Sequence, residues 1–266
     1  MSQISDASNK EKSLFAKEEV GIYLNVMKIL KERKDLIGKT IFYIACGDGR
    51  TTYFLRQLGL NVQPYDLLPE RYKLEDVPKY VDVQASFEIE DQAADFVVFQ
   101  EVIEHLPNQL FTLKELHRIL KDGGEVFLTT PSKSCIASKL SYLFFESETK
   151  RIPPWGASNS VWGEDKASGK IYYGHVWLLG LQQLRTMALL AGFKDVRFLR
   201  SELSKTSIFF LPILYLPIVL VSWKATRRYL KKAKTEEQRK EVMVQFKENI
   251  NPRNLLSKFL IAYLVK

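Results

Sequence analysis

The histidines are the side chains of this chain best matched to proton transfer near neutral pH. His105 follows the apolar run ADFVVFQ and the acidic stretch EVIE, and His175 lies in YYGHVW directly before a helical pattern. Either could accept a proton from a hydroxyl group, whereas His117 lies mid-helix and is expected to be a packing or surface residue. The alternative for His105 is a turn cap before Pro107, and for His175 a structural role. Further candidates for the same role are Glu101, Glu104, Tyr172 and Tyr173.

The stretch IFYIACGDGRTTYFL at 41–55 is a second chemical signal. It predicts a buried strand that ends in a tight glycine turn and opens into a helix from about Thr51 to Leu58. Gly47 and Gly49 allow the sharp turn and let a ligand approach the main chain closely. The free N–H groups at the start of the helix would point at that ligand. Two glycines alone are a weak signal, because many α/β proteins contain such a turn for structural reasons.

The elements that must position these residues alternate between strands and helices. Apolar runs predict strands at about 40–46, 61–66, 80–83, 94–100, 124–131, 195–199 and 257–266. Amphipathic patterns predict helices at about 12–34, 51–58, 109–120 and 179–193. Residues 132–172 are less regular. This order predicts an α/β fold with a doubly wound, mostly parallel seven-stranded sheet.

Composition restricts the class of protein further. The 266 residues are 46% hydrophobic, which suits one α/β domain with additions or two small domains. Cys46 and Cys135 give no disulfide framework. Residues 1–12 are polar and do not resemble a signal segment. A reduced, cytoplasmic setting is therefore expected, and no metal is expected because no Asp/Glu/His cluster has coordinating spacing.

Four blocks of sequence, taken in order, resemble class I S-adenosylmethionine-dependent methyltransferases, in particular the group with ubiquinone-biosynthesis and polysaccharide-pathway enzymes. The blocks are YIACGDG at 43–49, Asp66 after the second strand, ADFVVFQEVIEHLP at 94–107 and LKELHRILKDGGEVFLTTP at 113–131. A weaker fifth block runs from GHVWLLGLQQL to LLAGF at 174–193. The resemblance covers roughly 35–200 and the last strand. It implies the Rossmann-like methyltransferase fold and S-adenosyl-L-methionine as cofactor.

The resemblance also implies roles for individual residues. The family's glycine loop wraps the methionine end of the cofactor, which corresponds here to Ala45, Cys46, Gly47, Asp48 and Gly49. An acidic residue about 20 positions later accepts hydrogen bonds from the ribose hydroxyls, and Asp66 lies 19 residues after Gly47. The alternative for Asp66 is a turn residue before Pro69. The remaining assignments are Ser86 and Phe87 near the adenine, and Gln100, Glu101 and Val102 at the cofactor or substrate mouth.

Two residues depart from the family's glycine motif. Tyr43 stands where an acidic residue usually opens the motif, and Ala45 replaces the first glycine. The methyl group of Ala45 should be tolerated if its φ is negative. Loss of the carboxylate predicts reduced cofactor affinity, unless Asp48 takes over part of its role. The same departure supports an alternative function, that of a catalytically inactive, membrane-bound binding or scaffold protein.

The excess positive charge lies in the last quarter of the chain. Residues 201–266 contain 13 Lys+Arg and 5 Asp+Glu, a balance of +8 that equals the net charge of the whole chain. Eighteen uncharged residues at 206–223 precede a basic cluster of Lys224, Arg227, Arg228, Lys231, Lys232 and Lys234. Pro212 and Pro217 are expected to interrupt a helix there. The pattern favours a segment lying on an anionic membrane surface rather than a nucleic-acid site.

Residues 204–252 are thus predicted to be an apolar and basic helical insertion into a methyltransferase domain made of 1–203 and 253–266. A single membrane crossing would leave the last strand on the wrong side of the membrane. We therefore expect an enzyme peripheral to the cytoplasmic face that O-methylates a small lipid-soluble or lipid-linked acceptor, such as a quinone precursor or glycan intermediate. The alternatives for the insertion are a core or dimer-interface helix pair, the latter in a soluble small-molecule methyltransferase, and a transmembrane span.

Overall fold

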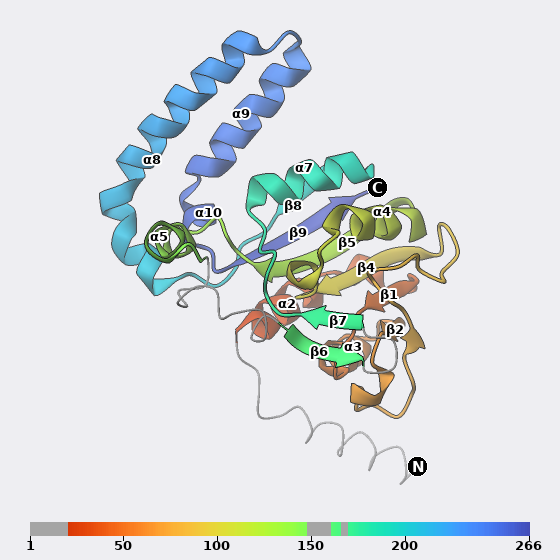
Figure 1. Cartoon of the computed structure of the whole chain (residues 1–266). Helices are drawn as coiled ribbons and strands as arrows, with labels where there is room; N and C mark the ends of the chain where they lie inside the picture. Colours follow the sequence, from red (N-terminus) through yellow and green to blue (C-terminus); the bar gives the residue numbers. More distant parts are fainter. Residues whose placement is uncertain (1–20, 148–160, 166–169) are drawn as a thin grey trace.

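A central sheet of seven strands organises the computed structural model, which describes residues 21–147, 161–165 and 170–266. The strand order is β3-β2-β1-β4-β5-β9-β8 (Figure 1). The strands are β1 Ile41–Ile44, β2 Val62–Asp66, β3 Lys79–Tyr80, β4 Ala94–Gln100, β5 Leu120–Pro131, β8 Asp195–Phe198 and β9 Phe259–Val265. β9 runs antiparallel to β5 and β8, and the pairs from β3 to β5 are parallel. The doubly wound, mostly parallel seven-stranded sheet is confirmed.

Helices cover both faces of this sheet. The α-helices of the described residues are α2 Ile22–Lys31, α3 Arg50–Gln57, α4 Gln109–Ile119, α5 Ile136–Phe145, α7 Leu181–Ala191, α8 Lys205–Lys232, α9 Glu236–Ile250 and α10 Pro252–Leu256, of which α2, α3, α4 and α7 pack on the faces of the sheet. Alternate residues of β1 point to opposite faces, so that Phe42 joins a core with α4 and α7 while Ile41 joins a core with α2 and α3. β6 Val161–Asp165 and β7 Lys170–Tyr173 form a separate two-stranded hairpin, and short 3-10 helices span Lys34–Leu36, Pro69–Arg71 and Ile103–His105.

Some elements differ from their predicted bounds. β3 is only Lys79–Tyr80, because it pairs with β2 at two positions and the next apolar residues, Val81 and Val83, enter the core instead of extending the ladder. The expected lead-in helix is described from Ile22 onward, and its first part lies outside the described residues. The irregular region contains α5 and the β6–β7 hairpin.

The predicted insertion contains α8 and α9, which form a helical hairpin projecting from the sheet domain between β8 and β9 (Figure 1). The expectation that the prolines interrupt the helix was wrong: α8 runs unbroken through Pro212 and Pro217. Each proline removes one N–H from the ladder, and the remaining bonds of the 28-residue helix keep it continuous. Asn249 Nδ2 donates to Ser222 Oγ over 2.7 Å, which ties the two helices together.

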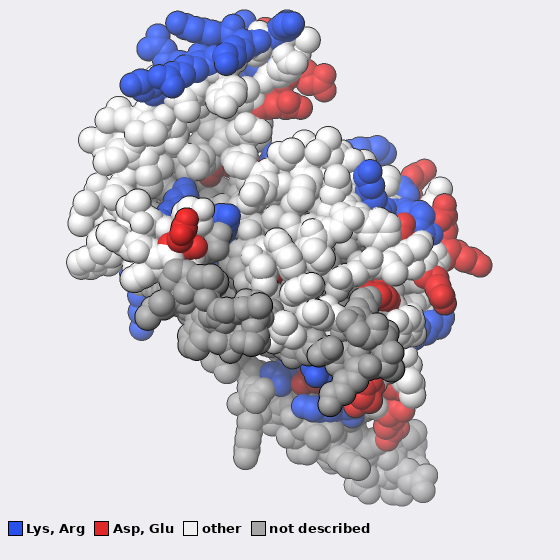
Figure 2. All heavy atoms as spheres, viewed as in Figure 1, with Lys and Arg blue, Asp and Glu red and all other residues white. Residues whose placement is uncertain are grey.

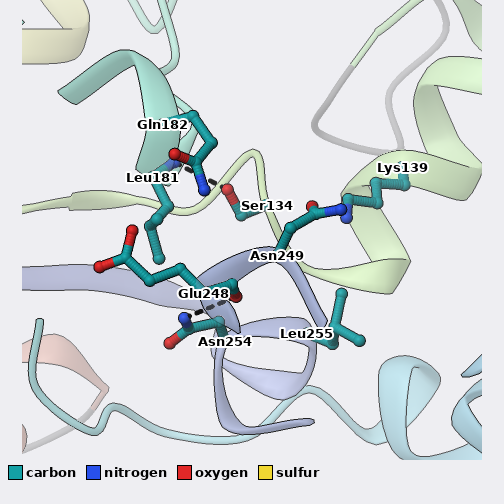
Figure 3. Close-up of a pocket in the computed structure, with 8 residues that line it drawn as sticks. All are labelled: Ser134, Lys139, Leu181, Gln182, Glu248, Asn249, Asn254 and Leu255. Carbon is teal, nitrogen blue, oxygen red and sulfur yellow. Dashed lines mark hydrogen bonds between the residues drawn. The ribbon is translucent and has the colours of Figure 1, made fainter. Parts of the chain in front are cut away.

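The base of the hairpin is fastened to the sheet domain. Arg185 of α7 forms an ion pair with Glu248 of α9 and donates to the Val196 carbonyl over 2.9 Å. A small cavity lies at this junction, and Figure 3 shows the residues that line it: Ser134, Lys139, Leu181, Gln182, Glu248, Asn249, Asn254 and Leu255. None of the residues predicted to bind cofactor lines this cavity, which belongs to the attachment of the hairpin.

Candidate functional site

The glycine turn and the acidic residue after β2 are brought together at the carboxyl ends of β1 and β2. The Gly47 N–H donates to Asp66 Oδ2 over 2.7 Å, and the Leu68 N–H donates to Asp66 Oδ1 over 2.8 Å. Asp66 is buried, and its carboxylate fixes both the turn after β1 and the turn after β2. Each carboxylate oxygen can accept a further bond, so the geometry remains compatible with ribose hydroxyls.

Gly49 is required by the backbone of this turn. It caps α3 with φ +86°, and a Cβ at this position would lie 2.7 Å from Tyr72 Cε2. Cys46 is buried beside it, and its N–H donates to the Tyr65 carbonyl over 3.0 Å. Glycine at position 49 therefore lets the backbone turn tightly against Tyr72 at the carboxyl end of β1.

Ala45 does not have the negative φ on which its tolerance was expected to depend. Its φ is +60°, in the left-handed region that favours glycine. The side chain of an L-residue costs about 1 kcal/mol there, so the replaced glycine leaves a local strain in the loop. The strain is local because the neighbouring Gly47 and Gly49 have positive φ without this cost.

Asp48 is engaged with neighbouring basic groups and with its own turn. Its Oδ1 accepts from the Arg50 N–H over 3.1 Å, and its Oδ2 lies 3.3 Å from Lys73 Nζ. These contacts give Asp48 a role in holding the turn. The compensating role proposed for Asp48 toward the cofactor stays a prediction.

The two residues assigned to the adenine segment have different surroundings. Ser86 is exposed in the loop that leads to β4, with its Oγ 3.4 Å from Glu115 Oε2. Phe87 is a core residue, and its N–H donates to the same carboxylate over 2.8 Å. Arg118 holds Glu115 with hydrogen bonds of 2.8 and 3.0 Å, which fixes this loop against α4. Sequence reasoning missed Glu115 and Arg118, whose i,i+3 spacing on a helix was the available signal.

Two buried carboxylates follow β4 in the block EVIEH. Glu101 has φ +52°, and its Oε1 accepts from Thr129 Oγ1 over 2.9 Å. Glu104 is fully buried, and its Oε2 accepts from Thr130 Oγ1 over 2.8 Å. Burial, helped by the charge of Glu104, raises the pKa of Glu101 to about 8, and burial raises the pKa of Glu104 to about 7. The site thus holds a buried carboxyl pair in which burial favours the protonated forms.

The structure also fixes the tautomer of His105. Its Nδ1 lies 2.7 Å from the Tyr173 carbonyl, which can only accept, so Nδ1 carries the hydrogen. Burial lowers the pKa of His105, so the ring is neutral at physiological pH with a lone pair on Nε2. The segment that follows β7 makes a second bond to the turn after β4, because the Trp177 N–H donates to the Glu104 carbonyl over 3.0 Å.

His175 joins this group from far along the chain. Its ring meets that of His105 edge-on with centroids 4.7 Å apart, and its Nε2 lies 3.8 Å from Glu104 Oε1. Two of the predicted catalytic candidates, His105 and His175, therefore lie around Glu104, while Glu101 binds Thr129 and is affected by the charge of Glu104. His117 instead packs its ring on Phe193 in the way expected of a packing residue. Tyr172 lies on β7, and Tyr173 contributes its carbonyl to His105.

The histidine–glutamate group can do two kinds of chemistry. A neutral His105 beside a carboxylate can accept a proton from a hydroxyl. The ligand atoms of Glu104, His105 and His175 also lie within 4.8 Å of one another, and Glu104 Oε1 is buried without a hydrogen-bond partner among the described residues. One carboxylate and two imidazoles form a donor set that fits a divalent cation. The expectation of no metal cluster rested on sequence spacing, which does not include the distant His175.

Comparison with known proteins agrees with this architecture. A family model described as "Methyltransferase domain" matches residues 29–197. A ubiquinone biosynthesis O-methyltransferase from Xanthomonas oryzae pv. oryzae (strain PXO99A) is 29% identical over 160 residues, covering 56% of this chain and 64% of that protein. The match therefore spans less than two thirds of the relative's length.

Solved structures with low sequence identity share the fold. A SAM-dependent methyltransferase from Archaeoglobus fulgidus superposes with a TM-score of 0.51 at 14% identity, covering 96% of this chain and 97% of that one. One from Mesorhizobium loti gives a TM-score of 0.50 at 13% identity, covering 93% and 99%. With its seven-stranded sheet, its glycine turn and the matching family model, the chain belongs to the methyltransferase domain family and has the class I S-adenosylmethionine-dependent fold.

Proposed function

We propose that this protein transfers a methyl group from S-adenosylmethionine to a hydroxyl oxygen of a small acceptor that resides in a membrane. The observation that carries the membrane part is α8, whose apolar surface is left uncovered. By length and composition this helix could cross a bilayer, and only 6% of its most apolar 18-residue window is buried. Soluble proteins rarely leave so large an apolar surface exposed without a partner.

The O-methylation part rests on the histidine–glutamate group. Methyl transfer from a sulfonium is an in-line displacement in which alignment supplies most of the acceleration. A hydroxyl acceptor must also lose a proton, and Nε2 of the neutral His105 is suited to accept it. The buried carboxylate of Glu104, which has a ligand atom within 4.8 Å of one of His105, would stabilise the resulting imidazolium by its negative charge. The name of the Xanthomonas relative, an O-methyltransferase of ubiquinone biosynthesis, supports an oxygen acceptor of the quinone-precursor type.

The exposed side of α8 is a defined stripe. Phe209, Ile213, Leu216 and Leu220 are 58–70% exposed and recur at steps of four, three and four residues, which places them on one face of the helix. The same spacing continues through Lys224, Arg227 and Lys231, all exposed. An apolar stripe that runs into basic residues on one face fits the interface of a bilayer with anionic headgroups.

The surface view agrees with this arrangement. Figure 2 shows Lys and Arg gathered at the tip of the hairpin, with an uncharged surface along α8 between the tip and the sheet domain. Asn249 of α9 bonds Ser222 on the side of α8 away from the stripe, and the Trp223 and Phe246 rings, 5.4 Å apart, meet at one edge of it. The stripe is therefore open to lipid, and Ile208 and Val221 beside it are exposed as well.

A transmembrane crossing does not fit the chain's path. After α8 the chain returns through α9 and α10 to β9, which pairs with β5 and β8 inside the sheet. α9 would have to cross back, yet its longest uncharged run is the five residues 242–246. A crossing helix needs about 20 apolar residues. The hairpin thus favours in-plane association with one membrane face, which we propose is the cytoplasmic face.

Sedimentation with vesicles tests the membrane part. Wild-type protein should sediment with vesicles containing anionic phospholipid at low salt, and less with neutral vesicles or at high salt. Replacing Phe209, Ile213 and Leu216 by Ser should release it while calorimetry shows unchanged cofactor affinity. The matched control replaces two apolar residues exposed elsewhere, Ile37 and Val77. Failure of the wild type to sediment, together with a dimer that the Ser variants dissociate, would instead assign α8 to a subunit interface.

Turnover tests the chemical part. Release of S-adenosylhomocysteine should depend on a phenolic, prenyl-tailed acceptor supplied in those vesicles. Cofactor binding without release for any hydroxylated acceptor would favour the inactive binding or scaffold protein.

A further inference from the structure

The side-chain amide of Gln100 has one end paired and the other end unpaired. Gln100 is 4% exposed, and its Oε1 lies 3.1 Å from Thr51 Oγ1 and 3.4 Å from the Tyr43 hydroxyl. Its Nε2 is buried and has no hydrogen-bond partner within the described ranges. Buried polar groups in folded proteins are almost always paired. An unpaired donor at this position indicates a partner that the described residues do not supply.

Gln100 lies where a doubly wound sheet binds its ligand. It is the last residue of β4, and the pairing of Ile44 with Phe99 places it beside Ala45, where the glycine turn begins. The chain leaves β1 toward β2 on one side, while β4 lies on the other, so the strand order reverses between β1 and β4. Ligands of such sheets bind in the crevice outside this reversal. Thr51, in the first turn of α3, closes the same corner.

The hydroxyls of Tyr43 and Thr51 both contact the Oε1 end of the amide. Burial raises the pKa of Tyr43 well above its usual value, so its hydroxyl stays protonated and can donate. With hydroxyls of both residues on Oε1, the NH₂ group is the end without a partner. A carboxylate at the position of Tyr43 would instead accept hydrogen bonds and favour the opposite orientation of the amide. The departure from the glycine motif and the glutamine after β4 therefore form one arrangement.

We infer that Gln100 Nε2 donates to the carboxylate of the methionine moiety of S-adenosylmethionine, and that Tyr43 and Thr51 are positioning residues for this amide. The inference rests on the proposed function for the identity of the cofactor. Nε2 can only donate, and the amino-acid end of the cofactor carries one anionic acceptor, the carboxylate, beside an ammonium group that can only donate. The amide NH₂ of Gln100, at the carboxyl ends of β1 and β4, is thus suited to bind the carboxylate of the cofactor, whereas an acidic side chain there would not be.

Calorimetry with two ligands that differ only in this group tests the inference. Wild-type protein should bind S-adenosylmethionine about tenfold more tightly than decarboxylated S-adenosylmethionine, as expected for a hydrogen bond to a charged group. Gln100→Leu should lose about that factor for S-adenosylmethionine and keep its affinity for the decarboxylated ligand. An equal loss for both ligands, or no loss for either, would overturn the inference. Thermal unfolding of the variant verifies that it is folded.

The positioning residues have their own prediction in the same experiment. Tyr43→Phe and Thr51→Val each remove one hydroxyl and should reduce the preference for the carboxylated ligand severalfold without changing affinity for the decarboxylated one. A purely structural role would lower both affinities together and would overturn the positioning assignment. Wild-type protein that binds neither ligand would overturn the proposed function itself. Binding of both without discrimination would overturn only the role of Gln100.

Discussion

The buried carboxylate of Glu104 and the imidazole of His175 lie 3.8 Å apart although they are 71 positions apart in the chain. The loop carrying His175 is held to the turn after β4 at two backbone points, the Tyr173 carbonyl on His105 Nδ1 and the Trp177 N–H on the Glu104 carbonyl. These bonds make the acidic end of β4 and the distant histidine into one group. Its ionisation can be tested without knowing the acceptor.

Glu104 should make the protein less stable as pH rises. Its pKa is raised to about 7 in the folded state, above an ordinary value of 4.5, so folding favours the protonated form. That contribution is fully present below pH about 4.5 and is lost as pH rises toward 7 and above. The measurement is the free energy of unfolding, obtained by denaturation in chelator-containing buffer. The difference between Glu104→Gln and the wild type should shift in favour of the variant by on the order of 2 kcal/mol between pH 5 and pH 8.5. The exposed Glu241→Gln is the control; the same gain in both variants would contradict a local cause.

His105→Asn should lower methyl transfer by about 10²- to 10⁴-fold, the usual contribution of a general base. Asn keeps a donor for the Tyr173 carbonyl, so the loop should stay in place and affinity for S-adenosylhomocysteine should be unchanged. The rate is measured as release of S-adenosylhomocysteine with the vesicle-bound acceptor. His117→Asn, which alters a ring packed on Phe193, is the control and should retain its rate. An unchanged rate for His105→Asn would remove this residue from the chemistry.

Asp66→Ala should weaken cofactor binding by about 1–3 kcal/mol and also lower the free energy of unfolding by a similar amount. Both effects follow because the carboxylate already accepts from Gly47 and Leu68 before any ribose is bound. Calorimetry and denaturant titration measure the two quantities separately. Loss of stability with unchanged cofactor affinity would leave Asp66 as a turn residue only.

Ala45→Gly should raise the free energy of unfolding by about 1 kcal/mol, because glycine adopts the observed φ of +60° without strain. The matched control is Ala225→Gly on the exposed side of α8, which should lose about 1 kcal/mol because helix interiors disfavour glycine. Urea denaturation of both variants gives the comparison. Equal decreases in the free energy of unfolding for both variants would mean that the turn accommodates Ala45 without strain, which would contradict the prediction.

The sequence by itself determined the succession of strands and helices along the chain, the glycine turn and the role of Asp66 at the same end of the sheet. These features are local: an apolar run such as ADFVVFQ has to be buried wherever it lies, and Gly49 is required by the turn in which it stands. The return of the chain to the sheet through SKFLIAYLVK could also be predicted, because β9 is a continuous apolar run.

Only the tertiary structure decided the contents of the site. Phe87 packs into the core while its N–H binds Glu115, and Ala45 has a positive φ in the folded turn. The meeting of Glu104 with His175 and of Tyr43 with Gln100 depends on chain segments far apart in sequence, for which no local spacing exists. The exposed stripe of α8 likewise became visible once α9 had covered another face. Periodicity shows that a face is apolar, whereas packing decides which face is left for a partner.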